Sequence, residues 1–106
     1  MEMLIHGKLR RPDGMPKQEF FGIWKQEATA ALEAVKAGII KNIWKVPGKY
    51  EVFLVMEVDS VDQMDEMMQS LPIWKLGYDH IVSSMEWIPL RSYEHWAKQL
   101  EELSAK

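Results

Sequence analysis

The sequence predicts an α+β fold in which two helices cover one face of a four-stranded antiparallel sheet. Three observations lead to this prediction: a long helix pattern follows the first strand pattern, a Pro47-Gly48 turn joins two adjacent strand patterns, and a second helix pattern precedes the last strand. With 106 residues, the chain can build one hydrophobic core but not separate catalytic and cofactor domains. We therefore expect a single domain over residues 1–106, with its core between about residues 3 and 90.

The first strand is expected over residues 3–9, where apolar and polar side chains alternate before Pro12-Asp13-Gly14 breaks the pattern. Successive side chains of a strand point to opposite faces of the sheet, so Leu4, His6 and Lys8 share one face.

The longest helix is expected over residues 16–37, with Pro16 suited to its first turn and Gly38 to the position just after its last turn. Its apolar stripe consists of Phe20, Ile23, Trp24, Ala31, Ala34 and Val35. At 100° per residue, Glu27 lies within about 60° of most of this stripe, so its carboxyl group should point the way the core residues point.

Two further strands, residues 39–46 and 50–58, are expected to pair as an antiparallel hairpin across the short Pro47-Gly48 turn. Both are rich in residues that favour strands, and the turn residues between them favour a sharp reversal.

The second helix is expected over residues 60–71, with Asp59 or Ser60 as its cap and Gln63 three residues after Ser60, as in a capping box. Its buried face is expected to consist of Val61, Met64, Met68 and Leu71. Leu71-Pro72 should end this helix, and residues 74–80 are expected to form a loop that edges a pocket.

A fourth strand is expected over residues 81–90, although its apolar residues change phase. A bulge near Ser83-Ser84 would reconcile the two halves. Ser92 then caps a C-terminal helix over residues 92–104, which we expect to pack on a neighbouring subunit. One side of this helix carries Tyr93, Trp96, Leu100 and Leu103.

The order βαββαβ followed by a tail helix is the ferredoxin-like arrangement, which leaves one face of the sheet without helices. Apolar residues on that face must be buried against something, and a face-to-face homodimer is the simplest solution. The expected assembly is a dimeric α+β barrel with a pocket between sheet and helices in each subunit.

Composition and charge exclude several classes of binding partner and cellular location. Thirteen basic and sixteen acidic residues are mixed along the chain, with a net charge of −3, so no nucleic-acid partner is expected. No apolar run approaches the roughly 20 residues of a membrane span, and the N-terminus lacks the order of a signal peptide, so we expect a cytoplasmic protein. There is no cysteine for disulfides, thiol catalysis or thiolate metal sites.

Acid–base chemistry is the catalytic class that the residues favour. His6, His80 and His95 show no metal-ligand spacing, and neither a phosphate-binding glycine loop nor a serine-hydrolase elbow is present. Glu27 on an apolar stripe should have a raised pKa, which suits proton transfer to and from carbon. The alternative is a solvated Glu27 at the edge of the stripe.

His6 and Tyr50 are candidate partners of Glu27, His6 as a proton relay and Tyr50 as a hydrogen-bond donor to a developing enolate. For both residues a purely structural role is the competing interpretation. The expected catalytic set is therefore Glu27, His6 and Tyr50, with no cofactor and no metal.

Aromatic residues are candidates for an apolar binding pocket, with packing in the core as the alternative. Lys45 or Lys25 could hold a substrate carboxylate if either is not simply solvated. The expected substrate-binding residues are Trp24, Trp44, Lys45, Trp74, Tyr78 and His80, with Trp87 as a further tryptophan at a strand position.

The chain resembles the muconolactone δ-isomerase family over roughly residues 3–73. The resemblance is carried by the order of several short motifs. These are Met3-Leu4-Ile5-His6, Glu27, Ile43-Trp44-Lys45, Gly48-Lys49-Tyr50, Val58 with Ser60-Val61, and Leu71-Pro72-Ile73.

The resemblance implies a ferredoxin-like fold, dimers often built into larger rings, and no cofactor. It also implies proton transfer between carbons of a muconolactone in aromatic-compound catabolism, with Glu27 as the shuttling base and His6 and Tyr50 nearby. Two features depart from the family pattern: the segment of residues 74–80 looks longer, and Ala28 stands where a lysine is usual. A cofactor-free monooxygenase, a polyketide-type cyclase and a non-catalytic ligand-binding or assembly module are the alternatives on such a fold.

Overall fold

The computed structural model of the protein describes residues 1–105. Its elements in chain order are β1 (Glu2–Leu9), α1 (Lys17–Lys36), β2 (Ile40–Lys45), β3 (Glu51–Glu57), α2 (Val61–Ser70), α3 (Pro72–Lys75), the short 3-10 helix η1 (Asp79–Ile81), β4 (Val82–Leu90) and α4 (Tyr93–Ser104). The strands form one antiparallel sheet in the order β2-β3-β1-β4. The predicted ferredoxin-like α+β fold is confirmed.

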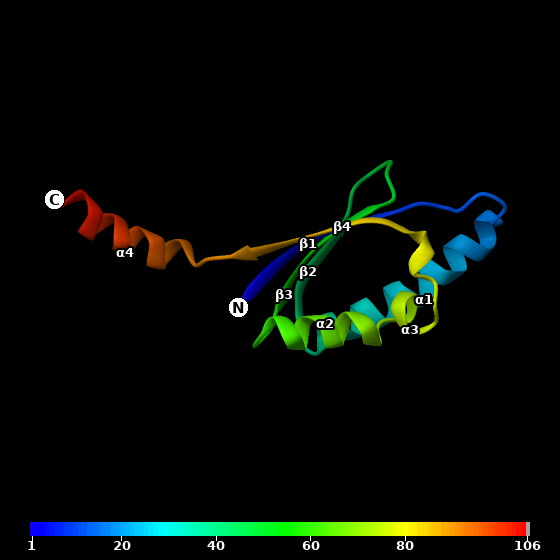
Figure 1. Ribbon diagram of the computed structural model, residues 1–106, viewed down its shortest axis with the longest axis horizontal. Coiled ribbons are helices and arrows are strands. Elements are labelled where there is room, and N and C mark those ends of the chain that lie inside the picture. Colours follow the sequence, from blue (N-terminus) through cyan, green and yellow to red (C-terminus); the bar gives the residue numbers. More distant parts are fainter. Residues whose placement is uncertain (106) are drawn as a thin grey trace.

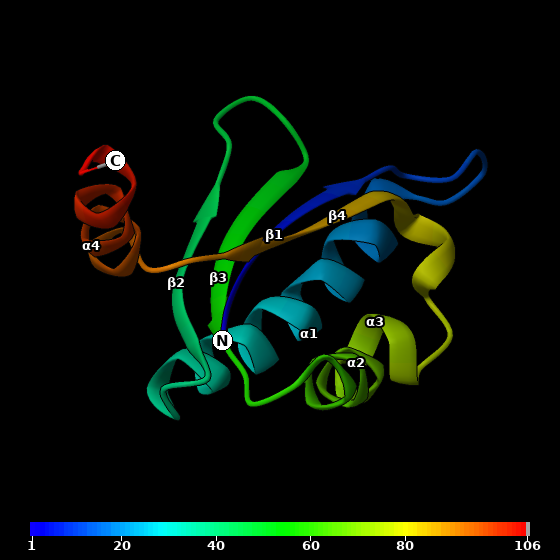
Figure 2. The same ribbon diagram turned by 60° about the vertical axis from the view of Figure 1, so that its left-hand side comes forward.

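The helices α1, α2 and α3 lie on one side of the sheet, and the other side is left without a covering helix in the described part of the chain (Figure 1). β4 continues beyond its neighbours and leads to α4, which stands away from the body in both views (Figure 2). The molecule therefore measures 62 Å along its longest axis but only 27 and 21 Å along the others.

Glycines with positive φ angles make the two sharp chain reversals around β2. Gly38 (φ 79°) follows α1, and the amide of Ile39 donates to Ala34 while that of Gly38 donates to Val35, which is the Schellman pattern of helix ends. Gly48 (φ 75°) occupies the β2–β3 turn, as the hairpin prediction requires.

The predicted bulge in the last strand is present. Gly7 pairs with Met85 and Lys8 with Ser84, but Leu9 pairs with Val82, so the register shifts at Ser83. The Ser83 hydroxyl donates to the carbonyl of Lys8 at 3.2 Å.

The segment after α2 differs from the expected loop. α2 ends at Ser70, just before the predicted Leu71-Pro72 stop, but Pro72 then begins the short helix α3. The missing N–H of Pro72 is no loss there, because a first-turn amide has no partner within the helix. Ile73 in α3 is buried and accepts a hydrogen bond from the amide of Tyr78 at its carbonyl. The expectation of a loop over residues 74–80 was therefore wrong at both ends, since Trp74 and Lys75 belong to α3 and Asp79 and His80 belong to η1.

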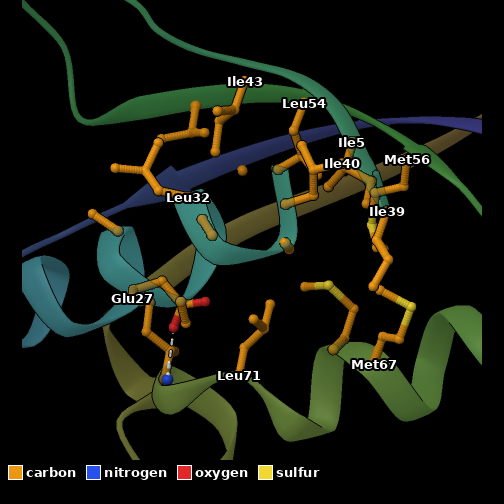
Figure 3. Close-up of a pocket in the computed structure, with 18 of the residues that line it drawn as sticks. Ile5, Glu27, Leu32, Ile39, Ile40, Ile43, Leu54, Met56, Met67 and Leu71 are labelled. Carbon is orange, nitrogen blue, oxygen red and sulfur yellow. Dashed lines mark hydrogen bonds between the residues drawn. The ribbon is translucent and has the colours of Figure 1, made fainter. Parts of the chain in front are cut away.

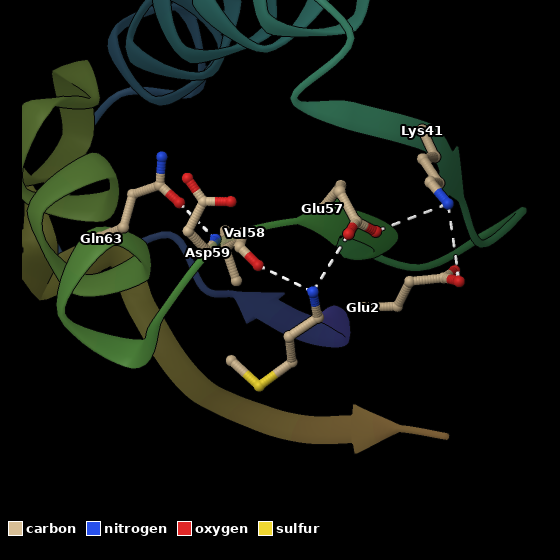
Figure 4. Close-up of polar contacts among 7 residues, drawn as sticks. Glu2, Lys41, Glu57, Val58, Asp59 and Gln63 are labelled. Atoms are coloured by element: carbon tan, nitrogen blue, oxygen red, sulfur yellow. Dashed lines mark hydrogen bonds and ion pairs between the residues drawn. The ribbon is translucent and has the colours of Figure 1, made fainter. Parts of the chain in front are cut away.

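The start of α2 is capped as the sequence predicts, with one difference. The Ser60 hydroxyl accepts from the amide of Gln63 at 3.1 Å, but the Gln63 side chain reaches back to the amide of Asp59 (Figure 4). Val61 is 59% exposed, so its assignment to the buried face was wrong. It belongs to the first turn of α2, at the end of the helix away from α3.

Charged groups join the ends of three strands near the N-terminus (Figure 4). The amine of Met1 donates to Glu57 at 3.0 Å and to the carbonyl of Val58 at 2.9 Å, and Lys41 lies 3.5 Å from both Glu2 and Glu57. The hydrogen bond from the terminal ammonium lowers the pKa of Glu57. These exposed contacts help to fix the strand register but add little to stability.

Two clusters of buried side chains form the core between sheet and helices. The larger contains Met3, Ile5, Ala31, Ile40, Met56, Val58 and Met68. The smaller contains Phe20, Ile23, Ile73 and Ile81 and lies where α1 meets α3 and η1. The space between sheet and helix layer that these clusters do not fill is the candidate site.

Candidate functional site

A large cavity of about 670 Å³ lies between the sheet and the helices. Its sheet wall comes from alternate positions of the central strands, such as Ile5 and Gly7 in β1 and Leu54 and Met56 in β3. Its other walls come from α1 and from the segment that contains α2 and α3 (Figure 3).

Small residues on α1 explain why this space is empty. The helix contributes four alanines to the cavity wall, and a fifth follows its last turn. A methyl group reaches too short a distance to fill the gap between a helix and a sheet, where larger side chains normally interdigitate. The five residues are Ala28, Ala30, Ala31, Ala34 and Ala37.

Glu27 is the carboxylate in this wall that is partly removed from water. Its Oε2 accepts a hydrogen bond from the amide of Ile73 at 2.8 Å. Burial raises the pKa of Glu27, and the hydrogen bond from Ile73 offsets part of this rise. In Figure 3 one oxygen lies on the bond to α3 and the other points away from that bond. The sequence-based expectation that Glu27 points toward the core agrees with this placement.

The hydrogen bond also gives Glu27 a structural task. Ile73 is the second residue of α3, and an amide in a first turn has no acceptor within its own helix. The carboxylate supplies that acceptor and ties α1 to α3. Sequence reasoning missed this contact because it did not foresee α3.

Of the candidate substrate-binding residues, Trp24, Trp74 and Lys45 line the cavity. Lys45 is exposed, and its Nζ donates to the carbonyl of Val46 at 3.1 Å. Trp44 also borders the cavity, but its cross-strand partner is Phe53, so the register places its indole on the outer face of the sheet.

His6 does not lie beside Glu27, and this corrects the expectation of a shared pocket. Its neighbours Ile5 and Gly7 line the cavity, so the alternation of a strand turns His6 to the uncovered face. There its Nε2 lies 2.8 Å from Glu51, whose pKa this hydrogen bond lowers, and its ring stacks on Phe53 at 4.0 Å.

Tyr50 is also outside the cavity wall. Its ring packs against Phe20 at 5.3 Å, Phe21 at 5.9 Å and Trp24 at 5.7 Å, measured between ring centroids. The phenol is thus part of an aromatic cluster at one end of α1, and it contacts the cavity only through Trp24.

Tyr78 and His80 do not line the cavity either. Tyr78 packs on the smaller core cluster, and His80 is exposed, with the two rings 6.4 Å apart. Lys25 and Trp87, the remaining candidates, are exposed and lie outside the cavity wall.

Two properties of residues 1–105 bear on other kinds of site. No group of three or more histidine, aspartate or glutamate side chains converges closely enough to hold a metal ion. No helix in the described part of the chain combines the length and apolarity needed to cross a membrane.

The fold and the site together define a small α+β protein with a large apolar cavity and one half-buried carboxylate in its wall. A family model described as muconolactone delta-isomerase matches residues 1–95. The chain belongs to the muconolactone delta-isomerase family.

Solved structures agree with this fold. The chain is similar to a crystal structure of muconolactone isomerase, with a TM-score of 0.71 and 18% identity, covering 87% of this chain and 90% of the other. It is also similar to 5-chloro-2-hydroxyhydroquinone dehydrochlorinase from Burkholderia phenoliruptrix AC1100 in complex with 2,5-dihydroxybenzoquinone. That TM-score is 0.63 at 22% identity, covering 90% of this chain and 98% of the other. A comparison with curated proteins finds no match.

Proposed function

We propose that the protein is a cofactor-independent isomerase that moves a proton between carbons of a lactone or enone, with Glu27 as the acid–base group. One observation carries the proposal: the carboxylate lies in the wall of an apolar cavity, with a raised pKa and one oxygen not used by Ile73. Membership of the muconolactone delta-isomerase family supports the reaction class.

In the proposed reaction, ionised Glu27 takes a proton from a carbon activated by the carbonyl group. The C–H electron pair moves into a dienolate, and Glu27 becomes neutral. The carboxylic acid then returns the proton to another carbon of the conjugated system, which restores the carbonyl and the carboxylate. Partial desolvation favours this cycle because it brings the pKa of the carboxyl group closer to neutral pH.

A substitution that keeps the hydrogen bond to α3 tests the role of Glu27. In Glu27→Gln, the amide oxygen can still accept from Ile73, but the side chain no longer takes a proton. We expect this variant to fold normally and to lose isomerisation of muconolactone and related butenolides, followed by NMR in deuterated buffer. Turnover or deuterium incorporation that survives the substitution would remove Glu27 from the mechanism.

A non-catalytic ligand-binding module is the second candidate function. The bond from Ile73 favours it, since a structural tether gives Glu27 a reason to be there without chemistry. Ligand binding that is unaffected in Glu27→Gln, with no exchange of any lactone proton in the wild type, would support this candidate.

We also propose that the protein forms a homodimer through the uncovered face of the sheet. Leu4, Phe53 and Val55 occupy the middle of this face, and Ile88 and Leu90 extend it along β4. Ile88 and Leu90 are exposed and the other three are half-buried, and a continuous apolar surface of this kind is typical of an interface. Size-exclusion chromatography with light scattering measures the assembly directly.

α4 gives a reason to expect a larger ring of subunits. None of its side chains is buried, and Tyr93, Leu100 and Leu103 are all at least 41% exposed. An amphipathic helix of this kind gains stability by covering its apolar side on another subunit.

A further inference from the structure

The charges in the cavity wall are few, and they are unfavourable for an anion. Its ionisable residues are Glu27, Glu33 and Lys45, so the wall carries two carboxylates and one ammonium group. The ammonium group belongs to an exposed residue near the end of β2 and is held by the carbonyl of Val46. The interior therefore offers no cation for a ligand carboxylate.

The hydroxyl group of the wall already has a hydrogen-bond acceptor. The Ser70 hydroxyl donates to the carbonyl of Met67 at 2.6 Å. Every other side chain of the wall is aliphatic, aromatic or a methionine, and one position is glycine. A carboxylate that entered this space would lose its water, and apart from the neutral indole N–H groups of the tryptophans the wall offers it no free donor and no compensating charge.

Glu27 adds a second reason against an anionic ligand. It must be ionised to take a proton, and two carboxylates that share a poorly hydrated space repel each other. An anion would therefore drive Glu27 toward the protonated form that has no base activity.

The size and lining of the cavity also favour a largely apolar ligand. About 670 Å³ is near the middle of the range of small-molecule sites, which enclose most of the surface of a drug-sized ligand. The alanine surface of α1 and the indoles of Trp24 and Trp74 face this volume. A bulky ring system fits such walls better than a small polar lactone.

From these observations we infer that the cavity takes an uncharged, largely apolar ligand, with one activated carbonyl group as its polar part. The identification of that ligand as the reacting molecule rests on the proposed function, whereas the preference for a neutral ligand does not.

Two probes with the same skeleton test the preference. N-phenyl-1-naphthylamine is uncharged, and 1-anilinonaphthalene-8-sulfonate adds one sulfonate group. We expect the dissociation constant of the neutral probe to be at least about tenfold lower, because the sulfonate must be desolvated without a cation to compensate its charge. Equal or tighter binding of the sulfonate, or no binding of the neutral probe, would overturn the inference.

Substitutions at Ala28 show whether the cavity sets this preference. Ala28 is exposed at its margin, one residue after Glu27, so a long side chain can be added there without disturbing the core. Ala28→Lys should move the ratio of the two dissociation constants toward the sulfonate by about tenfold, while Ala28→Met, of similar length but uncharged, should not. If lysine leaves the ratio unchanged, the probes bind elsewhere and the inference fails.

Turnover separates this inference from the proposed function. Muconolactone carries a free carboxylate, and its methyl and benzyl esters are neutral. Preferential, Glu27-dependent exchange of the esters would support both proposals. Preferential exchange of the free acid would support the isomerase and overturn the neutral ligand class. Selectivity for the neutral probe without exchange of any lactone would support the neutral ligand class and overturn the isomerase.

Discussion

Replacing Glu27 by alanine and by glutamine separates the two tasks of its carboxylate in this structure. Alanine removes the acceptor of the Ile73 amide, whereas glutamine keeps an acceptor at nearly the same place. Both substitutions remove the acid–base group. We expect both variants to be inactive and only the alanine variant to be less stable around α3.

The size of the effect follows from the hydrogen bond. A buried amide left without an acceptor costs about 1–3 kcal/mol, and we expect the lower half of that range because Glu27 is only half-buried and water can reach the site. This corresponds to roughly tenfold faster hydrogen exchange of the Ile73 amide in Glu27→Ala. For Glu27→Gln we expect stability within about 0.5 kcal/mol of the wild type, because a weaker hydrogen bond is offset by the absence of a desolvated charge.

The assay is amide hydrogen exchange by NMR, combined with urea unfolding at one protein concentration so that any oligomer contributes equally. Amides in β1 serve as an internal control, since β1 is hydrogen-bonded to β3 and β4 rather than to α3 and should be unaffected. Unchanged exchange of Ile73 in Glu27→Ala would refute the view that the carboxylate holds α3. Equal destabilisation by glutamine and alanine would refute the separation of the two tasks.

Three further measurements test other parts of the structure. The pKa of Glu27 is raised in the folded chain, so the wild type should lose stability relative to Glu27→Gln as pH rises from the ordinary pKa of 4.5 through the raised pKa. Above the raised pKa, the difference in unfolding free energy between the two proteins should be constant. A wild type that gains stability relative to Glu27→Gln as pH rises would contradict the burial of Glu27. Gly48→Ala should destabilise the protein by about 1–2 kcal/mol in thermal unfolding, because φ is 75° at this position. Gly22→Ala should instead stabilise it by about 0.5–1 kcal/mol, because Gly22 is an exposed residue within α1 and alanine favours helix. Phe53→Glu places a charge in the uncovered sheet face and should reduce the mass of the assembly in light scattering, and an unchanged assembly would exclude this face as the interface.

Periodicity and turn residues were enough to predict the fold. Alternation in β1, the three- and four-residue spacing in α1 and the Pro47-Gly48 turn are local signals, and each depends on neighbours only a few residues away. The Ser83 bulge was also predictable, because the apolar residues of β4 change phase there. α3 was not, since a single turn of helix has no periodicity to detect.

The site was predictable only in part. The direction of Glu27 followed from helical geometry, but its hydrogen bond to Ile73 joins residues 46 positions apart and depends on how α3 packs on α1. The position of His6 did have a signal in the sequence. Met3 and Ile5 alternate with it and are the buried side of the strand, so His6 had to face away from the helix that carries Glu27.

The apolar wall connects the chemistry of Glu27 with the choice of ligand. The same removal of water that raises its pKa also makes the cavity unfavourable for a second charge. A neutral ligand that fills the cavity expels more water from the carboxylate and raises its pKa further, so the ligand itself strengthens the base that acts on it. An anionic ligand would raise the pKa by repulsion instead, and would be bound most weakly in the state that can react. Selection of a neutral ligand and activation of Glu27 therefore have one physical cause, the alanine and aliphatic surface that faces the sheet.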